Sequence, residues 1–218
     1  MPDIVVYGTG GFGREVMFLI EDINKVENTW NVLGFLDDNA EIHRKIINGY
    51  PVLGGFDWII SHSKSRQIHV ALGIGNPKTK EMLAKKLENL SSNIFFPSLI
   101  HPSVIISEHV ELGKGNIICA GNILTCNIKL KDFVTINLSC TIGHDVVIED
   151  FVTILPGCNI SGNVHIKKRV EIGTNTAIIQ GLEIGENTII GAGATVVKSL
   201  PSNCTAVGTP AKPIKFHS

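Results

Sequence analysis

The sequence predicts two domains of different fold class: an α/β domain with a βαβ (Rossmann-like) order over residues 1–97, and an all-β coil over residues 98–218. Three observations support this. A strand, a glycine-rich turn and an amphipathic helix follow one another from residue 3, a sixfold repeat begins at Val104, and the character of the chain changes near Pro97. A chain of 218 residues is long enough for two cores.

Residues 1–97 begin with a strand, a turn and a helix. The apolar run DIVVYG precedes Gly8, Gly10, Gly11 and Gly13, and REVMFLIEDI follows with apolar residues at helical spacing. The spacing of Gly8, Gly10 and Gly13 is GxGxxG, a pattern whose backbone amides can hold a pyrophosphate at the helix N-terminus. A tight turn that binds no ligand is the alternative.

Two more predicted strands follow. VLGFLDD ends in Asp37 and Asp38, whose carboxylates could accept hydrogen bonds from a ribose or sugar hydroxyl. IHVALGIG leads through Gly73 and Asn76 into a helical segment. A dinucleotide-dependent dehydrogenase would share the glycine pattern, but about 97 residues supply only half of the usual doubly wound fold.

The second half of the chain repeats every six residues. Counted from Val104, sixteen consecutive units carry Ile, Leu or Val at their third position. These inward residues are Ile106, Leu112, Ile118, Leu124, Leu130, Ile136, Ile142, Ile148, Ile154, Ile160, Ile166, Ile172, Ile178, Ile184, Ile190 and Val196. The period predicts a parallel β-helix with three units per coil, in which residues 18 apart stack about 4.8 Å from one another.

Composition limits the partners. Lys plus Arg number 19 against 20 Asp plus Glu, so no excess charge attracts nucleic acid or anionic lipid. The sequence contains no apolar run of about 18 residues, the length that would predict membrane insertion. Its first residues lack the pattern of a secretory signal peptide. We expect a cytoplasmic protein with reduced cysteines. Cys140 and Cys158 would stack as a pair, which permits a disulfide or metal site, but ordinary packing is favoured and no metal is predicted.

The segment 137–164, NLSCTIGHDVVIEDFVTILPGCNISGNV, resembles the sialic acid O-acetyltransferase and bacillosamine-type sugar N-acetyltransferase family (NeuD/PglD-like) through IGHD, ILPG and ISGNV. The resemblance to hexapeptide-repeat acyltransferases covers residues 100–214. It implies a left-handed coil, a homotrimer, acetyl-CoA bound between neighbouring coils, and a nucleotide-sugar acceptor held by the N-terminal domain. The implied reaction is N-acetylation of a nucleotide-linked amino-deoxy sugar for surface-glycan biosynthesis; O-acetylation of a sialic acid is the alternative.

The resemblance also assigns roles to residues. His144 would be the general base, because neutral imidazole can accept the proton that an attacking amine or hydroxyl loses, and Asp145 would orient its ring. A solvated turn histidine is the alternative. The glycine loop, Asp37, Asp38, Gly73 and Asn76 are carried over as acceptor contacts.

Four further residues are matched to the family's pocket. Asn137 would line it or be a turn residue, and the Gly162 N–H would face the oxyanion or contact the cofactor. Thr153 stands where several members carry a second histidine that touches acyl-CoA, and the resemblance assigns it to the cofactor site. Lys212, in the run VGTPAKPI, would meet a CoA phosphate or be solvated.

Two other classes remain open at this level. A zinc hydratase of the γ-carbonic anhydrase type uses the same coil and needs three histidines, and His109, His144 and His165 lack its paired spacing. A non-catalytic sensor of nucleotide sugars is the third possibility.

Overall fold

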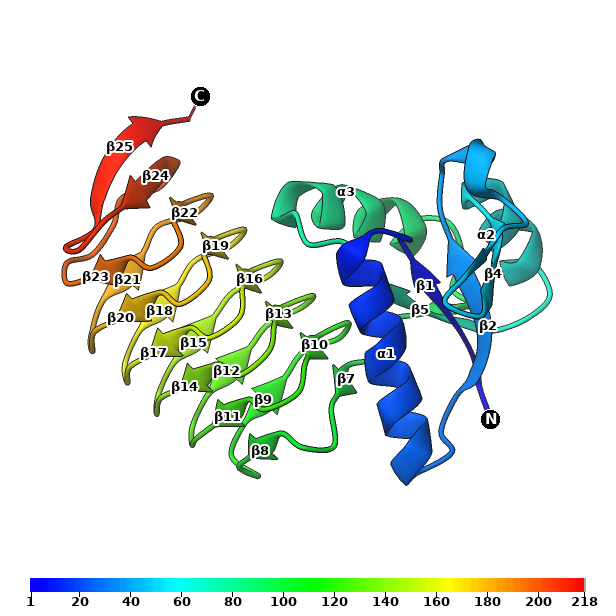
Figure 1. Cartoon of the computed structure of the whole chain (residues 1–218), viewed down its shortest axis with the longest axis horizontal. Helices are drawn as coiled ribbons and strands as arrows, with labels where there is room; N and C mark the ends of the chain where they lie inside the picture. Colours follow the sequence, from blue (N-terminus) through cyan, green and yellow to red (C-terminus); the bar gives the residue numbers. More distant parts are fainter. Residues whose placement is uncertain (218) are drawn as a thin grey trace. The chain divides into compact units, whose positions relative to one another are not determined.

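The computed structural model describes residues 1–217, which form two compact units (Figure 1). The first comprises Met1–Gly75 and Thr79–Leu99, and the second comprises Asn76–Lys78 and the chain from Ile100 onward. The division falls two residues after the boundary proposed from the sequence. Among residues 1–217, no helix has the length and apolar character needed to cross a membrane.

A six-stranded sheet, in the order β3-β4-β2-β1-β5-β6, forms the centre of the first unit. The elements of this part of the chain are β1 (Asp3–Tyr7), α1 (Gly11–Val26), β2 (Asn31–Leu36), η1 (Ala40–Ile42), β3 (Ile46–Ile47), β4 (Tyr50–Gly54), α2 (Phe56–Ser63), β5 (Ile68–Leu72), α3 (Pro77–Glu88) and β6 (Ile94–Phe95). β3 and β4 pair antiparallel, and the other strand pairs are parallel.

The central strand explains the apolar start of the chain. β1 lies between β2 and β5, and its residues from Ile4 to Tyr7 are buried, so both faces of the strand are apolar. α1 buries Val16, Leu19 and Ile20, which lie on one stripe of the helix. The carboxyl ends of β1, β2 and β5 therefore meet at one edge of the sheet, where α/β sheets bind ligands.

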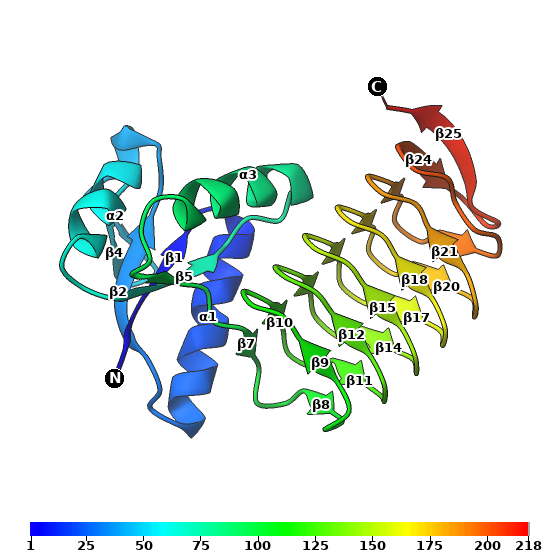
Figure 2. The ribbon, with the colours of Figure 1, turned by 180° about the vertical axis from the view of Figure 1, so that it is seen from behind.

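The second unit is a parallel β-helix whose coils stack along one axis (Figures 1 and 2). Sheet C contains β7 (Leu99–Ile100), β10 (Ile117–Ile118), β13 (Thr135–Ile136), β16 (Thr153–Ile154), β19 (Glu171–Ile172), β22 (Ile189–Ile190), β24 (Cys204–Val207) and β25 (Lys212–Phe216). Sheet D contains β8 (Ile105–Ile106), β11 (Ile123–Leu124), β14 (Thr141–Ile142), β17 (Asn159–Ile160), β20 (Ala177–Ile178) and β23 (Thr195–Val196). Sheet E contains β9 (Glu111–Leu112), β12 (Lys129–Leu130), β15 (Val147–Ile148), β18 (His165–Ile166) and β21 (Glu183–Ile184).

The register confirms the predicted period. Thr141 pairs with Asn159, 18 residues on, and Ile142 pairs with Ile160. The inward aliphatic residues from Ile118 to Val196 are buried in one continuous core. The fold class predicted for both domains is confirmed, with an α/β parallel sheet followed by a parallel β-helix.

Two details differ from the sequence prediction. Leu112, expected inside the coil, is 36% exposed because β9 is an edge strand of sheet E, with a neighbouring strand on one side only. The β3–β4 hairpin and α2 were not predicted, since β3 has only two residues and gives no readable pattern. Cys140 and Cys158, for which ordinary packing is the favoured prediction, are free buried thiols that donate to the carbonyls of Leu155 and Gly173.

Tight turns recur with the same period. A residue with positive φ stands at every sixth position from Gly115 to Gly193. Asn127, Asp145 and Asn163 occupy three of these positions, with φ of +55°, +58° and +56°. Asn and Asp tolerate this left-handed conformation better than most residues. The turns therefore place the side chains of residues 127, 145 and 163 in one column along a single corner of the coil.

Charge is unevenly distributed around the coil. Six segments that form sheet D and the turns on either side of its strands contain no Asp, Glu, Lys or Arg. We call this surface the charge-free face; it consists of residues 101–107, 119–125, 137–143, 155–161, 173–179 and 191–197. All charged residues between positions 101 and 197 lie in the eleven-residue segments between them.

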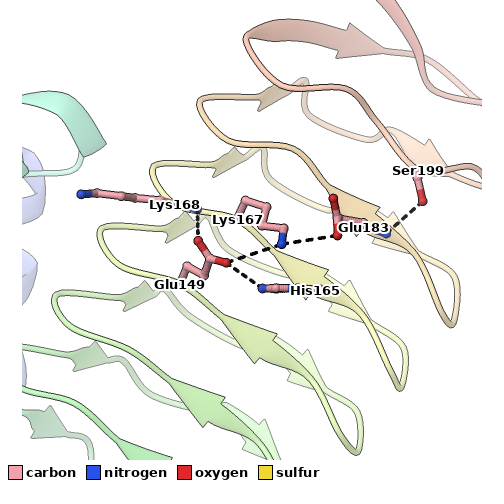
Figure 3. A network of polar contacts seen from close by, with 6 residues as sticks. All are labelled: Glu149, His165, Lys167, Lys168, Glu183 and Ser199. Atoms are coloured by element: carbon pink, nitrogen blue, oxygen red, sulfur yellow. Dashed lines mark hydrogen bonds and ion pairs between the residues drawn. The ribbon is translucent and has the colours of Figure 1, made fainter.

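The charges on sheet E are paired within the chain (Figure 3). Glu149 lies 2.8 Å from His165 Nε2 and accepts a hydrogen bond from the Lys168 N–H at 3.1 Å. The Lys167 ammonium lies 3.8 Å from Glu149 and 3.4 Å from Glu183. Sheet E is therefore a polar surface whose ions neutralise one another.

Candidate functional site

Three of the predicted loop glycines bring β1, α1 and β5 into close contact. Gly8 has a φ of +109° directly after β1. A Cβ on Gly13 would lie 2.0 Å from the carbonyl oxygen of Gly8, and a Cβ on Gly73 would lie 2.5 Å from the Cα of Gly13. Gly8, Gly13 and Gly73 thus set the N-terminus of α1 against the edge of the sheet.

Gly10 and Gly11 border open space. A Cβ on either residue would meet no atom within 4 Å. Gly10 is the N-cap of α1 and offers no side-chain hydrogen bond to the free amides of the first turn. This end of α1 is therefore open to an anionic group. Asn76, the exposed residue before α3, is placed by the chain at the end of the loop that follows β5.

Asp37 uses both carboxylate oxygens inside the protein. Its Oδ2 accepts hydrogen bonds from the N–H and hydroxyl of Thr9, at 3.0 and 2.6 Å, and its Oδ1 accepts one from the Asn39 N–H at 3.0 Å. Partial burial opposes ionisation, but these hydrogen bonds outweigh it and hold the pKa of Asp37 below its usual value. Asp37 therefore anchors the glycine loop as a carboxylate.

Asp38 leaves one oxygen free. Its Oδ1 accepts hydrogen bonds from the Tyr7 hydroxyl at 2.6 Å and the Phe56 N–H at 3.1 Å. Its Oδ2 has no hydrogen-bond partner in residues 1–217. Burial and the bond to Asp38 raise the pKa of Tyr7, so that hydroxyl remains a donor. Of the two predicted aspartates, Asp38 is the one with an oxygen available to a ligand.

A pocket of about 300 Å³ opens beside both aspartates. Its other lining residues are Ile74, Thr79, Met82, Leu83 and Lys86. The Lys86 ammonium lies 3.5 Å from the centroid of the Phe56 ring, which holds it at the wall of the pocket. Sequence reasoning missed the residues of α3 because they belong to no motif. Apolar walls with one ammonium and one free carboxylate oxygen suit a polar, ring-containing ligand.

His144 and Asp145 form a hydrogen-bonded pair at the corner between sheets D and E. His144 Nδ1 lies 2.7 Å from Asp145 Oδ2, and the side chains are 50% and 45% exposed. Hydrogen bonds from His144 and then Asn127 hold the pKa of Asp145 below its usual value. An ionised carboxylate on Nδ1 requires the imidazole proton there, which leaves the lone pair on Nε2. The pair has the arrangement of a base and its orienting acid.

The neighbouring coils contact this pair from both sides. Gly162, one coil above, lies against the imidazole, since a Cβ there would be 2.5 Å from Nε2 and from Cε1 of His144. Asn127, one coil below, donates a hydrogen bond from Nδ2 to Asp145 Oδ1 at 3.3 Å. Among residues 1–217 the Gly162 N–H has no acceptor. Sequence reasoning missed Asn127, although its offset of 18 from Asp145 was visible.

A depression of about 230 Å³ lies beside His144 on sheet D. Its lining residues are Thr125, Thr141, Ile142, Gly143, Asn159, Ile160 and Ser161. The Thr141 hydroxyl donates to Asn159 Oδ1 at 2.8 Å. The depression is uncharged and belongs to the charge-free face.

The other predicted residues lie away from His144 within one chain. Asn137 is on the corner between sheets C and D and accepts a hydrogen bond from the Leu138 N–H. Thr153 is on β16 of sheet C and is 1% exposed. Lys212 is exposed at the start of β25, after Ala211, whose N–H donates to Thr195 of β23. In sheet D, β23 is separated from β14, the strand before His144, by β20 and β17.

No group of three His, Cys, Asp or Glu side chains in residues 1–217 is arranged to hold a metal ion. Each histidine named for the hydratase alternative has a carboxylate neighbour of its own: His109 lies beside Glu108, and His165 beside Glu149. The geometry therefore gives no support to a three-histidine zinc site.

Comparison with known proteins finds one family model in each half of the chain. Residues 3–87 match the family model described as the PglD N-terminal domain, and residues 163–198 match the bacterial transferase hexapeptide (six repeats). The GDP-perosamine N-acetyltransferase of Escherichia coli O157:H7 is 30% identical over 144 residues, 66% of this chain. The chain spans 62% of the length of that relative.

Several solved structures match along nearly the whole chain. The acetyltransferase domain of PglB from Neisseria gonorrhoeae FA1090 has a TM-score of 0.89 and 30% identity, covering 98% of this chain and 100% of that domain. That domain is also solved in complex with acetyl coenzyme A. A variant of perosamine N-acetyltransferase from Caulobacter crescentus, in complex with CoA and GDP-perosamine, has a TM-score of 0.90 and 26% identity, covering 99% and 98%.

Proposed function

The chain belongs to the family of sugar N-acetyltransferases that join a PglD-type N-terminal domain to a hexapeptide-repeat coil, and we propose that it transfers the acetyl group of acetyl-CoA to the amino group of a nucleotide-linked amino-deoxy sugar for surface-glycan biosynthesis. The predicted family is confirmed. The observation that carries the proposal is the His144–Asp145 pair, with its free Nε2 beside an uncharged depression.

The proposed reaction is a direct transfer. The sugar amine attacks the thioester carbonyl carbon, and His144 Nε2 accepts the proton that the amine loses. Asp145 stabilises the imidazolium through Nδ1. Collapse of the tetrahedral intermediate breaks the carbon–sulfur bond, and His144 returns the proton to the departing thiolate. The products are an amide and the free thiol of CoA, so no covalent acyl-enzyme is needed.

The intermediate carries a negative oxygen that requires a donor. Among residues 1–217 the Gly162 N–H has no acceptor, and Gly162 lies against the imidazole, which supports the role expected for it. The absence of a side chain at Gly162 also gives the ring of His144 its place. Gly162 therefore serves the reaction in two ways: its N–H donates to the negative oxygen, and its lack of a side chain leaves room for the His144 ring.

The acceptor is assigned to the first unit. Open amides at Gly10 and Gly11 suit the pyrophosphate, and the pocket beside Asp38 and Lys86 suits the nucleoside. A nucleotide-linked amino sugar as acceptor is supported by the perosamine N-acetyltransferase named above, which was solved with GDP-perosamine. Asp37 contributes by holding Thr9 of the loop.

The working form is proposed to be a homotrimer. The charge-free face extends over six coils and exposes Ile105, Ile123 and Leu138, whereas sheet E pairs its own charges. Uncharged surfaces with exposed aliphatic side chains are the ones that associate. His144 lies at the border of this face, so a second copy would complete a cleft for pantetheine. Asn137 and Lys212 would meet the cofactor there, whereas Thr153 is buried on sheet C, outside that face.

The place of action is proposed to be the cytoplasm. Acetyl-CoA and nucleotide sugars are made there, and among residues 1–217 no helix is suited to span a bilayer. An O-acetyltransferase would use the same base, and only the acceptor separates the two reactions.

The test is an assay with acetyl-CoA and a panel of UDP-, dTDP- and GDP-linked amino sugars, in which free thiol is followed over time and products are weighed by mass spectrometry. We expect thiol release that depends on one amino sugar and a product heavier by one acetyl group. His144→Ala should lower kcat by about 10² to 10⁴-fold. Full activity of that variant in an intact assembly would refute the assignment.

A further inference from the structure

Asn127 lies in the coil below the catalytic pair, and among residues 1–217 its side chain hydrogen-bonds only to Asp145. Its Nδ2 donates to Asp145 Oδ1 at 3.3 Å, while Asp145 Oδ2 faces His144 Nδ1 at 2.7 Å. The carboxylate is thus held at both oxygens, by a different residue at each. No motif of the sequence includes Asn127.

The coil fixes the relative position of these residues through the backbone. Asn127 and Asp145 are 18 residues apart and occupy the same left-handed turn position, with φ of +55° and +58°. The Asp145 N–H donates to the carbonyl of Cys126 at 3.1 Å, and the Asn163 N–H donates to the carbonyl of His144 at 2.8 Å. Asn127 therefore reaches Asp145 without any movement of the chain.

We propose that Asn127 is a positioning residue for catalysis, which acts by holding the carboxylate of Asp145 so that one oxygen always faces Nδ1 of His144. The inference rests on the proposed function. Asp145 is 45% exposed, and an exposed aspartate samples several rotamers in water. A second hydrogen bond at Oδ1 selects the rotamer in which Oδ2 keeps the proton on Nδ1 and the lone pair on Nε2.

The chain offers a matched control. Asn163 occupies the same column one coil above Asp145, with φ of +56°, and its side chain has no partner in residues 1–217. Glycine is favoured at positive φ, so Asn127→Gly and Asn163→Gly should both fold. The first removes an amide that holds Asp145, and the second removes an amide that holds nothing.

Asn127→Asp tests whether charge at position 127 affects the protonation of His144. It places a second carboxylate beside Asp145, and the added negative charge favours the protonated form of the imidazole. The other titratable groups at this corner column are Glu108, His109, Cys126 and Lys198. None of them is altered by the substitution, so any movement of the pH profile comes from the pair.

The experiment measures kcat, KM for acetyl-CoA, and the pH dependence of kcat/KM on the full-length protein. We expect Asn127→Gly to lower kcat by about 3- to 10-fold, the value of one hydrogen bond, with KM for acetyl-CoA and the assembly unchanged. Asn163→Gly should match the parent protein. Asn127→Asp should move the acid limb of the profile to higher pH by about half a unit or more.

Two results would overturn the inference: equal values of kcat for Asn127→Gly and Asn163→Gly, or a pH profile of Asn127→Asp that superimposes on that of the parent. If His144→Ala loses activity while either of these results is found, the proposed function stands and Asn127 has no role in it. An active His144→Ala variant would remove both.

Discussion

The imidazole of His144 occupies the space in which a side chain at position 162 would lie. A Cβ on Gly162 would come within 2.5 Å of both Nε2 and Cε1 of His144, although the two residues are 18 positions apart. The glycine of one coil therefore sets the position of the imidazole in the coil below it. Gly162, which the resemblance assigns as a backbone donor, therefore also matters because it has no side chain in the space of the ring.

Gly162→Ala should displace this ring. The backbone of Gly162 does not have a positive φ, so alanine is compatible with the turn and the strain falls on His144. A displacement of about 1 Å in a catalytic group lowers the rate by about 10². We expect a fall of about that size in kcat, with the thermal midpoint nearly unchanged. Parent-like kcat in this variant would show that the ring has another productive position.

The carboxylate of Asp37 should make the stability of the first unit depend on acid pH. Its pKa in the folded chain lies below the unfolded value of about 3.9. The stabilisation is therefore complete above that value and is lost as the pH falls through the lower, folded value. Asp37→Asn should be less stable than the parent at pH 7, and the difference should shrink below about pH 4.

Urea unfolding followed by tryptophan fluorescence measures this difference, because both tryptophans, Trp30 and Trp58, lie in the first unit. A difference in unfolding free energy that stays constant between pH 7 and pH 3 would contradict the assignment of Asp37 as a hydrogen-bonded carboxylate.

Lys86→Met should weaken binding of the nucleotide sugar. The ammonium lines the pocket of the first unit and is held by the Phe56 ring. Loss of one charge-assisted contact should raise KM for the acceptor by about 5- to 20-fold and leave KM for acetyl-CoA unchanged. Lys85→Met is the control, since Lys85 pairs with Glu81 at 2.7 Å and does not line the pocket. Equal effects of the two substitutions would place the acceptor elsewhere.

Ile123→Glu should disrupt the proposed trimer. Ile123 is 38% exposed on β11 of the charge-free face, and a carboxylate buried there by a neighbouring copy would have no partner. Val147→Glu is the control on sheet E, where residue 147 lies between Lys129 and His165. Sedimentation should show smaller particles for the first variant and the parent mass for the second. An intact trimer of Ile123→Glu would move the interface to another face.

The repeat could be predicted because a β-helix imposes a pattern on residues that are close in the sequence. An aliphatic residue at every sixth position is required by the narrow interior, so Ile118 to Val196 were predicted to be buried from the sequence alone. The strand, turn and helix of residues 3–26 were predicted for the same reason. Leu112 was misassigned because the period says nothing about where a sheet ends.

The site was less predictable, since its parts depend on contacts between coils and between strands. Both oxygens of Asp37 are occupied by Thr9 and Asn39, which no spacing rule indicates. The offset of 18 places Asn127 beside Asp145, but their hydrogen bond also depends on left-handed turns at both positions, which the offset does not indicate. Asn137 and His144 are seven residues apart yet lie on different corners, because sheet D separates them.

The charge-free face consists of one seven-residue segment in each coil, followed by eleven residues that carry the charges. Such a surface can be extended or shortened by whole coils of 18 residues, and each remaining seven-residue segment stays on the same face of the coil. A single inserted residue would instead rotate every later strip and turn ionic side chains toward a neighbouring copy. Variation in length among chains of this design should therefore come in complete turns of the coil.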